Sequence, residues 1–161
     1  MRILDIMHDS IVDGVGLRAV IFFAGCPHRC KGCHNPQSWN IGYGKEYTID
    51  DVVEEIKSNK AIQGITFSGG DPFFQAKEIL ELAKEIKQNE YNLWAYTGFT
   101  FEEIIKDNVK LELLKQIDVL VDGRFVEELK DLTLRFRGSS NQRIIDVQKS
   151  IQENKIILYM N

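Results

Sequence analysis

The alternation of strand-like and helix-like segments constrains the fold of this chain more than any other feature. Four apolar runs are typical of buried strands: 17–24 (LRAVIFFA), 64–67, 92–97 and 117–122. The segments between them place apolar residues at helical spacing: 48–59, 79–86 and 99–107. Thr48 and Thr100 are suited to cap the first and the last of these helices. Alternation of this kind predicts an α/β fold with a mainly parallel sheet and right-handed crossovers, followed by late short strands at 142–147 and 155–160.

The length of the chain limits how that sheet can close. The chain has 161 residues, whereas a complete eight-fold α/β barrel needs about 250. We find no internal repeat and no Pro/Ser-rich linker that would divide the sequence. The sequence therefore predicts one domain over 1–161 with an open sheet.

Charge and hydropathy exclude two classes of partner. The 20 basic and 24 acidic residues give a net charge of −4, which argues against a nucleic-acid backbone as a ligand. No apolar run reaches the ~18 residues that a membrane helix needs. Because the N-terminal segment MRILDIMHDS carries acids where a signal peptide is apolar, we expect a cytoplasmic protein with no membrane association.

Three cysteines follow directly after the strand-like run 17–24. Cys26, Cys30 and Cys33 are the only cysteines of the chain, and an odd number packed so closely is not a disulfide framework. A cubane 4Fe-4S cluster needs one external ligand on each of its four irons, and thiolates suit iron. Three thiolates leave one iron open to a ligand that is not protein. An open metal position is typical of catalysis.

Structural zinc is the alternative interpretation of the same loop. Three cysteines with His28 or His34 would make a Cys3His site. His34 directly follows Cys33, so both side chains would struggle to reach one tetrahedral ion. The carboxyl edge of a parallel sheet is also where open α/β folds bind ligands, which favours the catalytic interpretation. His28 is then expected to neighbour the site or to face solvent.

Two motifs together resemble the radical S-adenosylmethionine (SAM) enzymes. They are the Cys-x-x-x-Cys-x-x-Cys spacing and the later segment Ser68-Gly69-Gly70-Asp71-Pro72. The longer segment 13–39 is similar to the activases of glycyl-radical enzymes. Three further segments resemble the subgroup that activates anaerobic (class III) ribonucleoside-triphosphate reductase: 96–103, 117–131 and 134–146. The resemblance implies a partial, open (β/α) barrel of the radical SAM type.

The resemblance also implies cofactors and the residues that bind them. The three cysteines would bind a 4Fe-4S cluster whose fourth iron is open for SAM. The implied SAM contacts are Gly32, Cys33, His34, Gly69, Gly70, Asp71, Tyr96 and Thr97. Two positions depart from the usual pattern, because many relatives have an aromatic residue at Gly32 and a glutamate at Asp71.

Gly69 and Gly70 admit two explanations from the sequence. A side chain at this strand exit would keep the backbone from approaching the amino group of SAM. A plain tight turn explains two adjacent glycines as well. The clustered cysteines favour the SAM contact.

The implied partner is the large catalytic subunit of the reductase, which would present a glycine-bearing loop. A low-potential electron donor such as flavodoxin would reduce the cluster. Three other functions remain as alternatives: an activase of a pyruvate formate-lyase-type enzyme, a small-molecule radical SAM enzyme such as a carboxy-deazaguanine synthase, and a zinc-stabilised interaction module without catalysis. Arg135, Arg137 and Arg143 form the one local basic concentration, which fits a solvated surface or a site for an acidic partner or an anion.

Overall fold

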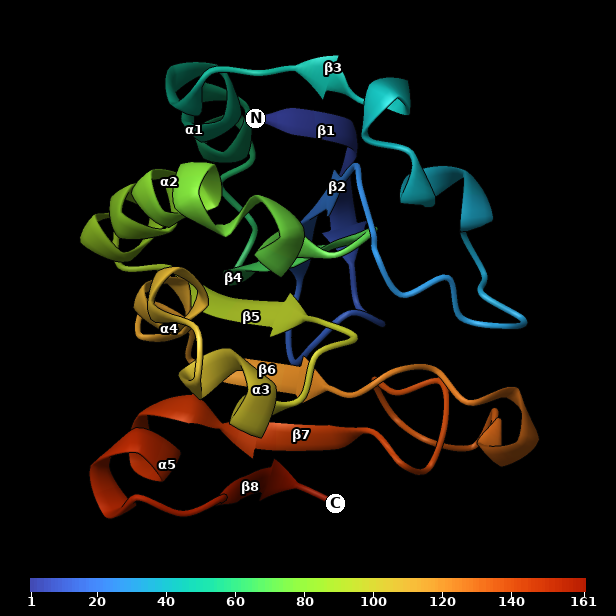
Figure 1. The fold of residues 1–161 in the computed structure, drawn as a ribbon. Helices are drawn as coiled ribbons and strands as arrows, with labels where there is room; N and C mark the ends of the chain where they lie inside the picture. The colour runs from blue at the N-terminus through green and yellow to red at the C-terminus, as the bar shows by residue number, and fades with distance from the viewer.

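A computed structural model describes residues 1–161, and its centre is one eight-stranded sheet (Figure 1). The strand order across the sheet is β3-β1-β2-β4-β5-β6-β7-β8. The strands are β1 Arg2–Ser10, β2 Arg18–Phe23, β3 Lys45–Glu46, β4 Gly64–Gly69, β5 Asn92–Tyr96, β6 Val119–Asp122, β7 Arg143–Asp146 and β8 Leu158–Met160.

The central strands of the sheet are parallel and the outer strands are not. β2, β4, β5 and β6 pair in parallel, so their carboxyl ends meet at one edge. The pairs β1–β2, β1–β3, β6–β7 and β7–β8 are antiparallel. The prediction of a mainly parallel sheet is therefore right for the centre and wrong for both sides. The sheet does not close on itself, and curvature into a partial barrel stays a prediction.

Five α-helices accompany the sheet: α1 Ile49–Ser58, α2 Ala76–Gln88, α3 Phe101–Ile105, α4 Asn108–Leu114 and α5 Val147–Glu153. Thr48 and Thr100 cap α1 and α3 as predicted, and each forms a reciprocal capping box, with Asp51 and Glu103 respectively. Short 3-10 helices occur at η1 Pro36–Trp39, η2 Ile41–Tyr43, η3 Pro72–Gln75 and η4 Glu127–Leu129. None of the helices has the length and apolar character needed to span a membrane.

The two faces of the sheet carry separate apolar clusters. Alternate residues of β2, namely Ala19, Ile21 and Phe23, join the main core with the buried faces of α1 to α4. The opposite face carries a smaller cluster around Trp94, whose ring lies 5.5 Å from the guanidinium of the buried Arg18. Burial lowers the pKa of Arg18 to about 10.

The first strand of the structure is absent from the sequence prediction. β1 pairs along β2, but its register shifts between Ile3 and Asp5 and again between Met7 and Ser10. These irregularities break the two-residue period by which a half-buried strand is detected. The expected first strand, 17–24, is therefore the second strand of the chain.

Candidate functional site

The carboxyl edge of the parallel strands opens into a cavity of about 850 Å³. Two long connections extend beyond that edge in Figure 1: the segment after β2 that carries the cysteines, and the segment 123–142 between β6 and β7. Both connections line the cavity together with the tips of β4 and β5. The sheet thus places the cysteines where open α/β folds bind ligands.

All three cysteines line this one cavity, as free and partly buried thiols. Two backbone hydrogen bonds close the base of their loop: Gly25 N donates to Ser38 O (2.7 Å) and Cys26 N donates to Trp39 O (3.2 Å). Burial raises the pKa of the Cys26 thiol to about 11, against the opposing effect of the His28 backbone N–H. The free Cys26 thiol is therefore protonated at neutral pH, and a bound cation would favour its thiolate.

Three thiols are the donor type that an iron-sulfur cluster takes, and they line one cavity. No three His, Cys, Asp or Glu side chains are grouped so that they could hold one metal ion. A cubane instead takes one thiolate on each of three irons, so its ligands surround a volume and share no common point. The histidines of the zinc alternative have other partners: His28 Nε2 lies 2.6 Å from Asp71, and His34 packs against Phe125.

Six of the eight implied SAM contacts lie on the cavity wall: Cys33, His34, Gly69, Gly70, Tyr96 and Thr97. Gly32 and Asp71 do not form part of this wall. Burial raises the pKa of the Tyr96 hydroxyl further above its ordinary value. The group is therefore a hydrogen-bond donor at neutral pH, as tyrosine generally is. The structure brings the candidate set together around one space, and contact with SAM itself stays a prediction.

Gly69 and Gly70 are required by the packing of the β4 tip against the end of β2 and the start of the cysteine connection. Gly69 has φ +103°, and a Cβ there would lie 2.3 Å from the backbone nitrogen of Phe23. A Cβ on Gly70 would lie 2.4 Å from the carbonyl oxygen of Gly25. The missing side chains therefore let two backbones approach each other, a reason that the sequence argument did not identify.

Asp71 connects the tips of neighbouring strands through its buried carboxylate, which has no exposed surface. The carboxylate accepts hydrogen bonds from the Thr97 hydroxyl (2.9 and 3.0 Å), from Gly98 N (2.9 Å) and from Phe73 N (3.0 Å). His28 supplies a further contact from the cysteine loop. These partners leave the carboxylate directed into the protein, so its contribution to the site is to hold other groups in place.

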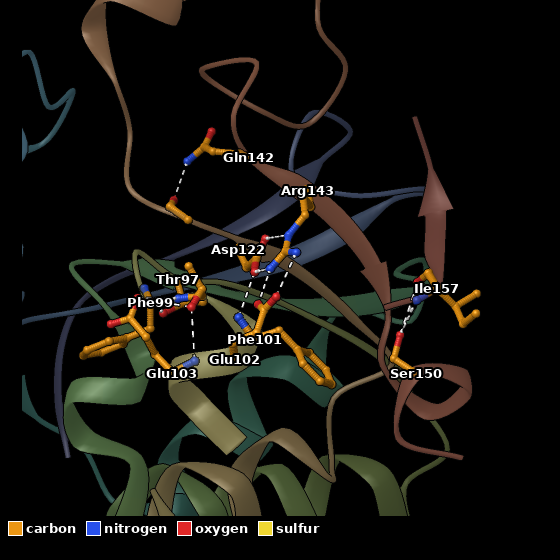
Figure 2. A network of polar contacts seen from close by, with 12 residues as sticks. Thr97, Phe99, Phe101, Glu102, Glu103, Asp122, Gln142, Arg143, Ser150 and Ile157 are labelled. Carbon is orange, nitrogen blue, oxygen red and sulfur yellow. Dashed lines mark hydrogen bonds and ion pairs between the residues drawn. The ribbon is translucent and has the colours of Figure 1, made fainter. Parts of the chain in front are cut away.

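The three arginines of the basic segment have different environments. Arg143 forms ion pairs with the buried Asp122 and with Glu102, each with a nitrogen to oxygen distance of 2.6 Å (Figure 2). These hydrogen bonds raise the pKa of Arg143 and lower that of Glu102. Arg135 and Arg137 instead line the cavity. Arg143 is therefore a structural residue, and no single basic cluster exists.

Sequence reasoning missed many residues of the cavity wall. That wall includes Ile11, Val12, Phe125, Leu132, Leu134, Phe136 and Gln142. Ile11 and Val12 come from the connection between β1 and β2, far from the cysteines in sequence. No local pattern in these segments indicates that they meet across a cavity.

Comparison with known proteins identifies the family of this chain. Residues 12–145 match the family described as "4Fe-4S single cluster domain". A protein named anaerobic ribonucleoside-triphosphate reductase-activating protein from Vibrio cholerae is 38% identical over 143 residues, covering 84% of this chain and 91% of the relative. Proteins of the same name from Enterobacteria phage T4 (40% over 141 residues, 84% and 87% covered) and Haemophilus influenzae (35% over 154 residues, 89% and 97% covered) are also similar. The chain belongs to the family of anaerobic ribonucleoside-triphosphate reductase-activating proteins.

Proposed function

We propose that this chain activates an anaerobic ribonucleoside-triphosphate reductase by reductive cleavage of SAM at a 4Fe-4S cluster. One electron would break the bond between sulfur and the 5′ carbon, giving methionine and a 5′-deoxyadenosyl radical. That radical would take a hydrogen atom from a glycine of the reductase and leave a glycyl radical there.

One observation carries the proposal: three thiols and the strand-tip segment Gly69–Gly70 line the same cavity at the carboxyl edge of the sheet. The family match to a 4Fe-4S domain and the names of the relatives agree with it. Cys26, Cys30 and Cys33 would hold the cluster. Three protein ligands for four irons leave room for a substrate to bind the metal directly.

The chain's other residues would bind and enclose SAM. The partly buried backbone at Gly69 and Gly70 lines the cavity and would present polar groups to the methionine amine, and the Tyr96 hydroxyl would offer a donor on the same wall. The open sheet leaves the cavity accessible from the side. The reductase itself would cover it and keep solvent from the radical, while a low-potential donor such as flavodoxin would supply the electron.

The proposal is tested with anaerobically reconstituted chain, SAM, a reductant and a reductase labelled with α-deuterated glycine. We expect deuterium in 5′-deoxyadenosine and a glycyl radical signal in the reductase by electron paramagnetic resonance (EPR). A glycyl radical formed without deuterium transfer would exclude direct abstraction. Cleavage without reductase is expected to be slow or uncoupled.

The alternatives give different outcomes in the same assay. Coupled turnover of a small molecule would favour an enzyme of the carboxy-deazaguanine synthase type. A glycyl radical formed on a pyruvate formate-lyase-type enzyme, and not on the reductase, would replace the proposed partner and leave the proposed chemistry unchanged. If the purified chain binds zinc and contains no iron or sulfide and shows no absorbance near 400 nm, the result would favour a zinc-stabilised interaction module without catalysis.

A further inference from the structure

His28 is the point where the cysteine loop contacts the tips of three neighbouring strands. Its Nε2 lies 2.6 Å from Asp71 Oδ2 just after β4, and its Nδ1 accepts a hydrogen bond from Arg124 Nε (3.2 Å) just after β6. Its ring meets the ring of Phe99, beyond β5, at a centroid distance of 4.4 Å. The side chain is only 3% exposed, so the interior of this loop is anchored in the protein.

The hydrogen bonds give each nitrogen of the imidazole one partner. The Arg124 Nε–H can only donate, so Nδ1 is the acceptor of this contact. Asp71 already accepts from the Thr97 hydroxyl and from the Gly98 and Phe73 amides, as a carboxylate does, so Nε2 is the donor to it. The imidazole thus lies between a guanidinium and a carboxylate. Each ring nitrogen has one partner, which fixes the orientation of the ring.

Gly98 supplies the room that this imidazole needs. A Cβ at Gly98 would lie 2.4 Å from His28 Cδ2 and 2.7 Å from Nε2. Gly98 has no left-handed φ that would require glycine for conformational reasons. The close approach of the imidazole therefore accounts for the glycine at the tip of β5.

Few other contacts hold the loop between its first and second cysteines. Residues 27–29 donate no backbone hydrogen bond to another backbone group, and the contacts beside His28 are those of the His28 and Arg29 amides with Cys26 and of the Arg29 guanidinium with the Trp39 ring at 5.5 Å. Arg29, between His28 and Cys30, has φ +51°, a conformation that a non-glycine residue rarely keeps unless its surroundings impose it. The anchored imidazole lies directly before this strained residue, so it limits where Cys30 can lie.

We propose that His28 is a positioning residue that sets the placement of Cys30 and Cys33 around the cluster, and through them the geometry of the open iron. The inference rests on the proposed function. It gives the Asp71 carboxylate a role that needs no contact with SAM, because Asp71 holds His28. It also assigns Arg124 a part in the site, although Arg124 is exposed and lies outside the wall of the cavity.

The test compares His28→Leu with His28→Gln in anaerobically reconstituted holoprotein. Gln can still donate to Asp71 at the reach of Nε2, whereas Leu cannot. We expect His28→Leu to keep a cluster but to shift the EPR spectrum of its reduced form and to weaken SAM binding about 10- to 100-fold. His28→Gln should recover much of both. His8→Leu is the matched control, because His8 lies on β1, pairs only with Glu55 and should change neither.

Two further variants keep the inference falsifiable if His28→Leu folds poorly. Gly98→Ala should displace the imidazole without touching a cysteine and should reproduce the EPR shift. Arg124→Leu should weaken SAM binding on its own but add little in a double variant with His28→Leu. A wild-type spectrum and wild-type SAM affinity in all three single variants would overturn the inference and leave the proposed function standing. A wild-type chain that assembles no 4Fe-4S cluster would overturn both.

Discussion

The tips of β4 and β6 look alike and have different tasks. Each tip combines a glycine in a left-handed conformation with a buried aspartate: Gly69 (φ +103°) with Asp71, and Gly123 (φ +97°) with Asp122. Asp122 pairs with Arg143 of the neighbouring strand β7 and accepts a hydrogen bond from Phe101 N, so its partners belong to the scaffold. Asp71 reaches the cysteine loop through His28.

The glycines differ in the same way. A Cβ on Gly69 would strike the backbone of β2, whereas a Cβ on Gly123 would find its nearest neighbour at 3.8 Å. The β4 tip is thus fitted tightly against the end of β2, from which the cysteine connection leaves, and the β6 tip has open space. The comparison teaches that one local arrangement can stabilise a sheet at one position and shape a site at another.

The largest expected effect is a loss of SAM cleavage without a loss of stability of the fold. Cys26→Ala, Cys30→Ala or Cys33→Ala should each abolish SAM cleavage, because two thiolates cannot hold the cluster with one open iron. The free energy of unfolding of the metal-free chain should change little, since all three cysteines are partly exposed. Iron counting and urea unfolding measure the two quantities. A variant with four irons and full turnover would refute the ligand assignment.

The glycines offer a matched pair of substitutions. Gly69→Ala should cost about 3 kcal/mol or more of unfolding free energy, because overpacking against backbone adds to the strain of the left-handed conformation. Gly123→Ala carries that strain alone and should cost about 1 kcal/mol. Chemical denaturation of the metal-free chains compares them. Equal losses would contradict the account of the β4 tip as the tighter contact.

Arg143→Met tests the β6 tip through its ion pair. The substitution leaves the buried Asp122 without its cation, and we expect the free energy of unfolding to fall by about 2 kcal/mol. This is less than the full cost of breaking a buried ion pair, because the Arg143 side chain is 32% exposed. Cluster content should stay normal.

The same ion pair predicts a dependence on pH. The pKa of Glu102 is lower in the folded chain than in the unfolded chain. The stabilisation that Glu102 contributes is therefore present above its unfolded pKa and is lost as the pH falls through its folded pKa. The gap between wild type and variant should therefore narrow in acid.

The smallest expected effect concerns a surface contact beside the site. Lys31 and Glu127 approach to 3.9 Å between the cysteine loop and the β6–β7 connection, with the Lys31 side chain 84% exposed. Lys31→Gln should change the unfolding free energy by less than about 0.5 kcal/mol and leave SAM affinity unaltered. A large loss of SAM affinity would show that the surface pair positions the loop, which would contradict the proposal that His28 does so.

Much of the central fold could be predicted because its signals are local. The apolar run of β2, the caps of α1 and α3 and the spacing of the cysteines are each contained within a few neighbouring residues. The strand β1 was missed because its register shifts hide the alternation of buried and exposed residues. The antiparallel sides of the sheet depend on pairing that no single segment encodes.

The sequence brings the candidate ligands together in one loop and says less about the residues that support them. Cys26, Cys30 and Cys33 identify themselves by type and spacing, and thereby indicate where the cavity lies. His28 and Asp71 are 43 residues apart, so their contact exists only in the folded chain. Arg143 was grouped with Arg135 and Arg137 by proximity in sequence, whereas its partners lie on β6 and α3.

The order of the strands has a consequence for how the protein is made. When the short strand β3 is left aside, the strands lie across the sheet in the order in which they occur in the chain, from β1 to β8. The sheet can therefore grow by one strand at a time during synthesis. The three cysteines emerge early from the ribosome, well before Asp71, Gly98 and Arg124 have been added. The newly made loop therefore passes through a period in which its thiols are present and its anchors are not, and the last of these anchors, Arg124, is added only after β6.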